Sequence, residues 1–408
     1  MKETLSTTEE TLHLKMNCRR ILILRPDNIG DVLLFTGALR HIRNLYPDVH
    51  ITLAVQPHIV NLVELCPYID ACVPVNHLTW HGKVEHARYP CKHKVGQMIR
   101  KMNRLWNAFH RPRPFDTIIY PVKSPQQSHL EVIYCLHAYQ ISGINGCRLN
   151  APGNGYPSKL EPAELFTDRM NVSGIDSCTH ELSTTLDFLR FLGCRVTTVD
   201  DIRPLFWFAD SEKNHLSGIR RNRRKIIGLF PGASMEGKCW QTSNYGKLAK
   251  LLGNQLIYVI FGGPMDRILA DQVAHSIKAL NSNVEILNMA GQMTLRELAK
   301  TIMACDLFIS MDTSGLHMAI AADVPAIGII GGGHFNRFLP WGDPNKVTIL
   351  TKTMKCFHCN WVCTQGDFAC IQDVTPGEVA QAGIKLLTGT DSRHERQFAD
   401  DQCNYTGL

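Results

Sequence analysis

Short runs of consecutive apolar residues recur along the chain, and most are followed by a stretch with helical spacing. The run at residues 21–24 has no polar alternation, which is typical of a strand buried on both faces. Helical positions follow over residues 32–46, and further apolar runs lie at residues 51–55 and 71–75. This strand–helix–strand order predicts a parallel α/β unit at the start of a domain.

The second half of the chain repeats the same pattern. Five apolar runs predict strands at residues 226–230, 256–261, 284–287, 307–311 and 326–330, and helical spacing separates them at residues 245–252, from 268 onward, at 295–304 and from 316. Pro325 ends the last of these helices. The pattern predicts a second doubly wound parallel sheet.

The segment between these two halves carries weaker signals. Helical spacing at residues 96–109 and 180–192, with Gly193 ending the second helix, is separated by a predicted strand at residues 115–120. Residues 121–180 carry no clear pattern, although the Pro, Gly and Asn content around residues 150–162 indicates loops. Residues 204–209 are predicted as a linker and residues 379–387 as a final helix.

Length then sets the domain count. A chain of 408 residues is longer than one hydrophobic core usually holds. We expect an N-terminal domain over residues 17–205, a C-terminal domain over residues 206–387 and a disordered polar tail over residues 388–408.

The net charge of +6 is unevenly spread, with much of the excess at residues 81–113 and 220–225. A basic surface favours an anionic partner, although a solvated charged face also explains the second run. The sequence shows neither a signal peptide nor an apolar run long enough to span a bilayer, so we expect a cytoplasmic protein. Most of its 15 cysteines are then expected to be free thiols.

The turn after the first predicted strand lacks the spacing G-x-G-x-x-G, which argues against dinucleotide binding. It contains Gly30 and places Asp31 at the start of the next helix. Ligands bind at the carboxyl ends of the strands in doubly wound sheets, so the Asp31 carboxylate is expected to point into such a cleft. Capping of the helix by Asp31 is the alternative.

A second turn, Asp312-Thr313-Ser314-Gly315, follows the predicted strand at residues 307–311. The helix that begins there offers free backbone N–H groups and a positive dipole end, which suit a phosphate. An ordinary helix cap at Asp312 or Thr313 is the alternative.

Five segments resemble glycosyltransferase family 9, the heptosyltransferases of lipopolysaccharide core assembly and their relatives. They are ILILRPDNIGDVLLFTGALRHIRNLYPDVHITL, GLFPGASMEGKCW, FGGPMD, NMAGQMTLRELA and DLFISMDTSGLHMAIAADVPAIGIIG, in the order in which the family has them. The resemblance covers roughly residues 20–75 and 226–385. It implies GT-B architecture, in which two doubly wound Rossmann-like domains face a central cleft, with the acceptor bound by the first and the nucleotide-sugar donor by the second.

The resemblance further implies inverting transfer of a heptose from ADP-heptose to an acceptor hydroxyl. Asp31 matches the catalytic aspartate, and a carboxylate there can take the proton of the attacking alcohol. Lys238 matches a lysine that stabilises the leaving diphosphate. The residues implied in donor binding are Ser234, Asp266, Asp312, Thr313, Ser314, Gly315 and His317. No D-x-D motif is apparent, so no metal cofactor is expected for catalysis.

Four cysteines, Cys356, Cys359, Cys363 and Cys370, have the spacing C-x2-C-x3-C-x6-C. Four thiols so close in sequence could hold a structural zinc or iron ion, or they could be reduced thiols in a surface loop. The resemblance is compatible with the first alternative, because some relatives that glycosylate autotransporter proteins bind iron at similar clusters. Four sulfur ligands leave no open position, so no catalysis by the metal is expected.

The expected partners are a nucleotide-sugar donor and an anionic glycolipid or glycan acceptor, with no nucleic acid. We expect the basic segment at residues 81–113 to meet anionic groups of the acceptor, and peripheral contact with the cytoplasmic face of the inner membrane. Two alternatives stay open: a heptosyltransferase that acts on an autotransporter protein, and a non-catalytic scaffold that binds a sugar nucleotide or a metal.

Overall fold

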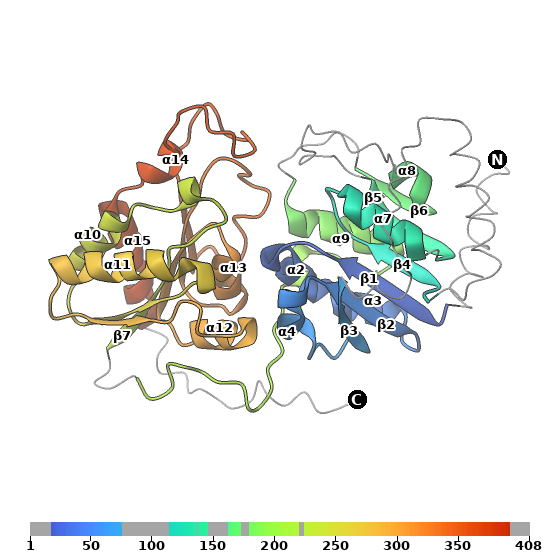
Figure 1. The fold of residues 1–408 in the computed structure, drawn as a ribbon, viewed down its shortest axis with the longest axis horizontal. Coiled ribbons are helices and arrows are strands. Elements are labelled where there is room, and N and C mark those ends of the chain that lie inside the picture. Colours follow the sequence, from blue (N-terminus) through green and yellow to red (C-terminus); the bar gives the residue numbers. More distant parts are fainter. Residues whose placement is uncertain are drawn as a thin grey trace. The chain divides into compact units, whose positions relative to one another are not determined.

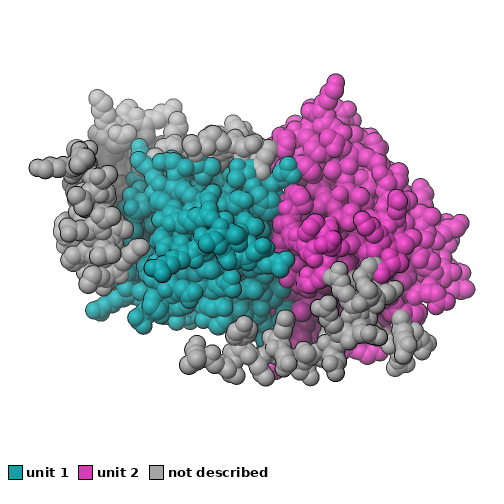
Figure 2. Space-filling model, turned by 180° about the vertical axis from the view of Figure 1, so that it is seen from behind, with its two compact units in different colours: residues 1–209, 336–338 teal, residues 210–335, 339–408 magenta. Residues whose placement is uncertain are grey.

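The computed structural model describes residues 18–75, 114–136, 138–145, 162–172, 179–219 and 224–391. The chain divides into two compact units (Figures 1 and 2). Unit 1 contains residues 1–209 and 336–338, and unit 2 contains residues 210–335 and 339–408. In the part of the chain that is described, no helix is both long and apolar enough to cross a membrane.

Unit 1 is built on a sheet of six parallel strands in the order β3-β2-β1-β4-β5-β6. The strands are β1 (Arg20–Arg25), β2 (His50–Val55), β3 (Ala71–Pro74), β4 (Thr117–Tyr120), β5 (Gln140–Asn145) and β6 (Asp168–Asn171). The chain first builds outward from β1 to β3 and then returns to add β4 on the other side of β1. The carboxyl ends of β1 and β4 therefore border the point where the strand order reverses, which is where such sheets bind ligands.

The helical segments of unit 1 connect these strands. They are α2 (Ile29–Phe35), η1 (Thr36–Ala38), α3 (Leu39–Leu45), η2 (Pro57–Ile59), α4 (Val60–Val63), α7 (Gln127–Leu136), α8 (Pro162–Leu165), α9 (Glu181–Leu192) and η3 (Val199–Ile202). The helix predicted over residues 32–46 is interrupted at η1. The interruption lies where Gly37 packs directly against the backbone of η3 and the residue after it.

Unit 2 repeats the topology, with six parallel strands in the order β12-β11-β10-β7-β8-β9. The strands are β7 (Lys225–Phe230), β8 (Leu256–Ile260), β9 (Glu285–Asn288), β10 (Leu307–Met311), β11 (Ala326–Ile329) and β12 (Val347–Leu350). The helical segments are η5 (Glu236–Lys238), α10 (Thr242–Leu252), η6 (Pro264–Asp266), α11 (Arg267–Leu280), α12 (Leu295–Ile302), α13 (Ser314–Ala321), α14 (Ala369–Gln372) and α15 (Pro376–Asp391). Here the order reverses between β7 and β10.

The predicted parallel sheets are confirmed in both units. Residues 121–180, where the sequence predicted no strand or helix before residue 180, contain α7, β5, α8 and β6. The loops predicted around residues 150–162 lie almost entirely outside the described residues. β6 has the sequence DRMN and alternates between partly buried and exposed residues at the sheet edge, so it carries no apolar run. The prediction also missed β12, the other edge of the second sheet. The helix predicted at residues 96–109, the basic segment 81–113 and most of the tail lie outside the described residues.

Replacement of Gly37 by alanine should destabilise unit 1. A Cβ atom at Gly37 would lie 2.2 Å from the carbonyl oxygen of Arg203 and 2.3 Å from that of Ile202, so the backbone of η1 or η3 must shift. We expect a loss of about 1–3 kcal/mol in the free energy of unfolding, measured by denaturant titration. The matched control is Gly377→Ala, since the nearest atom to a Cβ there is 3.9 Å away. Equal effects of the two changes would contradict the packing argument.

Candidate functional site

The predicted site residues fall in both units, and each group is described within its own unit. Asp31 belongs to unit 1, where it lies in the first turn of α2 just after β1. The remaining predicted residues belong to unit 2: Lys238 and the donor-binding residues follow β7, β8 and β10, and the four cysteines follow β12.

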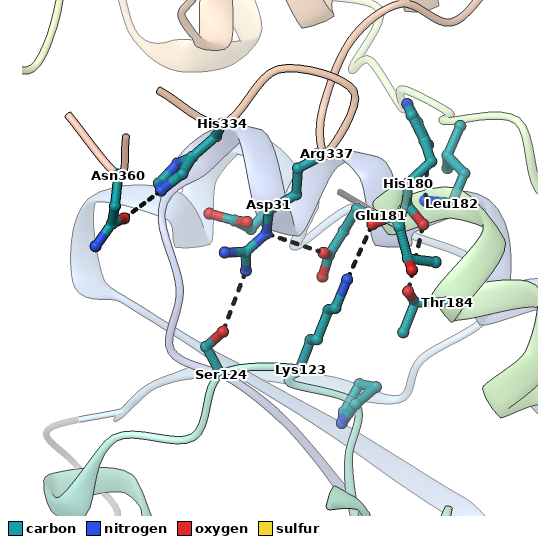
Figure 3. A network of polar contacts seen from close by, with 12 residues as sticks. Asp31, Lys123, Ser124, His180, Glu181, Leu182, Thr184, His334, Arg337 and Asn360 are labelled. Carbon is teal, nitrogen blue, oxygen red and sulfur yellow. Dashed lines mark hydrogen bonds and ion pairs between the residues drawn. The ribbon is translucent and has the colours of Figure 1, made fainter. Parts of the chain in front are cut away.

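Asp31 lies in a cluster of charged side chains at the point where the strand order of unit 1 reverses (Figure 3). Its carboxyl group is only partly exposed. The pKa of Asp31 is raised to about 7, chiefly by burial and also by the negative charges of Asp27 and Glu181, while the charges of Arg25 and Arg337 oppose the shift. A carboxyl group that titrates near neutral pH can both accept and return a proton, as a general base requires.

Arg25, the last residue of β1, holds the turn in front of Asp31. Its guanidinium is 1% exposed, forms an ion pair of 2.9 Å with Asp27 and donates hydrogen bonds to the carbonyl oxygens of Pro121 and Asp31. Burial raises the pKa of Asp27 and the Arg25 charge opposes this. Arg25 therefore ties β1, the start of α2 and the segment after β4 into one rigid corner.

Two further charged groups complete the cluster. Glu181 is the first residue of α9, and its backbone N–H donates to the carbonyl oxygen of Arg337 at 2.8 Å. Lys123 follows β4, is 1% exposed, and donates to the carbonyl oxygen of Thr179 at 2.9 Å. A backbone hydrogen bond thus joins the start of α9 to the segment that carries Arg337, and the Lys123 side chain joins the segment after β4 to the residues before α9.

In unit 2, Lys238 lies at the end of η5, after β7, and its amine is half-buried. Burial lowers the pKa of Lys238, and the Asp312 carboxylate opposes this; the pKa of Asp312 is in turn raised by burial and lowered by Lys238. The ends of β7 and β10 therefore bring a cation and a carboxylate together where the strand order of unit 2 reverses. Lys238 Nζ also lies 3.5 Å from the exposed Ser234 hydroxyl.

The amine of Lys238 rests on an aromatic face that the sequence analysis did not identify. Its Nζ lies 3.6 Å from the centre of the Trp361 ring, within the range of a cation–π interaction. The indole N–H of Trp361 donates to His334 Nδ1 at 3.2 Å, and His334 Nε2 lies 2.6 Å from Asn360 Oδ1. Trp361 has a left-handed φ of 64°, which a non-glycine residue keeps only when its packing holds it.

The turn after β10 leads into α13, whose N-cap is Thr313. The Thr313 hydroxyl lies 3.1 Å from Ser310 Oγ, and Gly315 packs directly against the Phe230 ring. His317 is buried on α13 and accepts a hydrogen bond of 3.0 Å at Nδ1 from the Trp341 indole N–H. Because an indole nitrogen can only donate, this contact keeps Nδ1 of His317 unprotonated.

Asp266 connects two turns of unit 2. Its carboxylate accepts the Gly263 backbone N–H at 2.7 Å and lies against Gly232, where a Cβ atom would come within 2.5 Å of Oδ1. The side chain therefore joins the turns that follow β7 and β8.

The prediction of a zinc or iron ion on Cys356, Cys359, Cys363 and Cys370 is not supported. Among the residues described, no group of three or more potential ligands is arranged to hold a metal ion. Burial raises the pKa of the Cys370 thiol and the other three sulfurs raise it further, so the protonated form is favoured.

Aromatic side chains hold this segment in place instead. A Cβ atom on Gly332 would lie 2.2 Å from the Phe357 ring, and one on Gly333 would lie 2.3 Å from the Trp361 ring. The backbone N–H of His358 donates to Gly332 O at 2.7 Å.

The two sheets and their strand order define a GT-B fold, and solved structures share it. The structure of Escherichia coli ADP-heptose lipopolysaccharide heptosyltransferase II superposes with a TM-score of 0.61 over 91% of this chain and 99% of that chain, at 19% identity.

Sequence comparison points in the same direction. Residues 204–364 match the sequence model of glycosyltransferase family 9 (heptosyltransferase). Lipooligosaccharide heptosyltransferase 2 of Campylobacter jejuni is 29% identical over 172 residues, which are 41% of this chain and 53% of the relative. In that alignment the chain spans about half the length of the relative. Lipopolysaccharide heptosyltransferase 2 of Salmonella typhimurium is 23% identical over 90% of this chain and 99% of the relative.

Sequence reasoning missed several residues that the fold brings to these positions. Arg25 and Asp27 lie inside the segment that resembles the family, at the end of a predicted strand, and Glu181 lies at the start of a predicted helix. These positions could have identified the three residues as candidates. Arg337 and Trp361 follow no predicted strand and had no such signal.

Replacement of Asp31 by asparagine should stabilise the protein at alkaline pH. The pKa of Asp31 is about 7 in the folded chain and near 4 in the unfolded chain, so its ionisation disfavours folding. This cost to stability begins as the pH rises above the pKa of Asp31 in the unfolded chain, and it is complete above the pKa in the folded chain. We expect the variant to gain up to about 4 kcal/mol at pH 8, and much less at pH 5, in denaturant titrations. Asp48→Asn, at an exposed aspartate of the same unit, is the control; a gain independent of pH would contradict the argument.

Proposed function

We propose that this protein is an inverting glycosyltransferase that moves a heptose from ADP-heptose to an acceptor hydroxyl in lipopolysaccharide core assembly. The observation that carries the proposal is the Asp31 carboxyl, which lies where the strand order of unit 1 reverses and titrates near pH 7. The match to the family model and the names of the relatives support this choice of donor and pathway.

Unit 1 would bind the acceptor. A sugar hydroxyl is a poor nucleophile, and Asp31 would take its proton as the oxygen attacks the anomeric carbon of the donor. The carbon–oxygen bond to the diphosphate breaks as the new glycosidic bond forms, so the configuration at that carbon inverts. Since the pKa of Asp31 is close to neutrality, the carboxylate is a stronger base than an ordinary aspartate while a substantial fraction remains ionised at pH 7.

Unit 2 would bind the donor. Negative charge grows on the departing diphosphate, and the Lys238 ammonium would stabilise it together with the N–H groups at the start of α13. Thr313, Ser314 and Gly315 would contact the phosphates, and Asp312 would contact the sugar. Ser234 lies beside Lys238 and would contribute a hydroxyl to the same region. No metal ion is needed in this scheme.

The acceptor would be an anionic glycolipid, and the protein would work at the cytoplasmic face of the inner membrane. The support for this location is the acceptor chemistry of the relatives, which are lipopolysaccharide and lipooligosaccharide heptosyltransferases by name.

The test of the proposed function is transfer by the purified protein. Incubation with ADP-heptose and heptose-deficient lipopolysaccharide should release ADP and extend the acceptor, whereas UDP- and GDP-sugars should give no product. Asp31→Asn should lower kcat by about a hundred- to ten-thousand-fold and leave ADP affinity, measured by calorimetry, unchanged. Full activity of that variant would remove Asp31 from the mechanism, and transfer to a protein instead of the glycolipid would redirect the acceptor assignment.

The contact between Lys238 and the Trp361 ring predicts how ADP affinity should change in variants of both residues. Lys238→Ala should weaken both ADP binding and kcat, because the diphosphate is charged before bond cleavage and more so afterwards. Trp361→Leu should weaken ADP binding by up to about 30-fold, since a partly desolvated cation–π contact is worth about 1–2 kcal/mol.

The control for this prediction is Trp361→Phe, which keeps an aromatic face and loses the hydrogen bond to His334. It should fall between the leucine variant and the unaltered protein in calorimetry. Unchanged ADP affinity in both Lys238→Ala and Trp361→Leu would place Lys238 outside the donor site.

A further inference from the structure

A three-residue segment of the C-terminal half packs with unit 1. Residues 336–338 group with unit 1, although the chain on both sides of them belongs to unit 2. Arg337, at the centre of this segment, is 6% exposed. An arginine is almost never so deeply buried without a partner, so its contacts indicate what it does.

Arg337 is held from three directions. Its carbonyl oxygen accepts the Glu181 N–H at 2.8 Å, its Nη2 donates to Ser124 Oγ at 3.4 Å, and its guanidinium carbon lies 4.8 Å from the centre of the Phe338 ring. Its Nε lies 3.7 Å from Glu181 Oε2, an ion pair without a hydrogen bond, and both of these atoms are buried. The backbone anchors Arg337, while its charge is only partly satisfied by Glu181.

The remaining charge of Arg337 acts on Asp31. Figure 3 shows the guanidinium beside the Asp31 carboxyl, and the Arg337 charge lowers the pKa of Asp31. Arg25 acts in the same direction, but it is already committed to the ion pair with Asp27 and to two backbone carbonyl groups. Replacement of Arg337 would therefore remove a positive charge near Asp31 and leave intact the contacts by which Arg25 joins β1 to α2.

Other titratable groups around the cluster do not offset this charge. Burial lowers the pKa of His180, and His180 Nδ1 accepts the Leu182 N–H, so this ring is neutral near pH 7. Burial lowers the pKa of His129 to about 4 and raises that of Tyr120 well above its usual value, so both are neutral as well. Lys123 is directed to the Thr179 carbonyl. Among the described residues, the charges that act on the Asp31 carboxyl are therefore those of Asp27, Glu181, Arg25 and Arg337.

We propose that Arg337 is a positioning residue for Asp31: with Glu181 and Ser124 holding its guanidinium, it keeps the Asp31 carboxylate ionised and ready to accept the proton of the acceptor. The inference rests on the proposed function, because it assigns Arg337 a part in the reaction of Asp31. Glu181 acts with the opposite sign, so the Arg337–Glu181 pair sets the pH at which the base becomes available.

The test is the pH dependence of kcat/KM, whose acid limb reports the base in the free enzyme. Arg337→Met removes the positive charge at similar side-chain volume and leaves Glu181 without its ion-pair partner. The acid limb should therefore move upward by about one pH unit, which is the size of the effect that a neighbouring arginine has on the pKa of an aspartate. Activity at pH 6 should fall about tenfold and recover at alkaline pH. Arg337→Lys should restore most of the position of the limb, because the charge returns.

Glu181→Gln removes a negative charge near Asp31 and should therefore move the acid limb to lower pH. Arg203→Met is the matched control, since Arg203 is an exposed arginine of the same unit, and loss of its charge should leave the profile unchanged. A loss of activity in Arg337→Met that is equal at every pH would show a purely structural role and overturn the inference. If that variant fails to fold, an unmoved limb in Glu181→Gln would overturn it equally.

A stability measurement separates this inference from the proposed function. The stabilisation that Asp31→Asn brings at pH 8 should be larger in the Arg337→Met background, because the buried carboxylate there lacks its compensating charge. This readout needs no activity. If the Asp31→Asn enzyme is active, the proposed function is wrong. If it is inactive, but the stability effects of the two changes are additive and the acid limb does not move in Arg337→Met, only the role of Arg337 is wrong.

Discussion

The reversal of strand order in each parallel sheet is the constraint on which both candidate sites depend. Adjacent loops leave in opposite directions at such a point, so the carboxyl ends of the two central strands stay uncovered by crossover helices. In unit 1 these strands are β1 and β4, and in unit 2 they are β7 and β10. Because the strands are buried on both faces, polar groups concentrate at these ends, where backbone N–H groups and side chains can satisfy them.

The two units use this position with different electrostatics. Unit 1 gathers two arginines and three carboxyl groups at low exposure, and the outcome is a carboxyl that titrates near neutral pH. Unit 2 instead places Lys238 on the face of Trp361, where the Asp312 carboxylate acts on its charge. The proposed base is thus surrounded by charges of both signs, whereas the proposed diphosphate-binding cation lies on a neutral ring.

Aromatic side chains order the segment that carries the four cysteines. Phe357 and Trp361 pack on consecutive glycines after β11, so close that a side chain at Gly332 or Gly333 would collide with the rings. Burial of two aromatic rings is worth several kilocalories per mole, which is enough to fix a short segment that has little regular structure. In this packing the indole of Trp361 is brought to Lys238, so the same contacts that order the loop also build part of the proposed donor site.

The sequence by itself determined the architecture and the anchors of both sites. Strands buried on both faces are continuous apolar runs, so β1, β2, β7, β8 and β10 could be read directly, and Asp31, Lys238 and Asp312 could be assigned to the ends of such runs. The edge strands β6 and β12 escaped prediction because an edge strand need not be apolar throughout.

The tertiary structure alone decided which charges and rings surround those anchors. Arg337 lies more than 300 positions from Asp31 in the chain, and Trp361 lies more than 120 from Lys238. Local periodicity records which residues are buried, but it does not record which distant segment covers them. The same limit applies to the cysteines, whose spacing permits a metal site while the packing of Phe357 and Trp361 arranges their loop otherwise. The pKa of a buried carboxyl depends on the sum of its neighbours' charges, and only the folded chain assembles that sum.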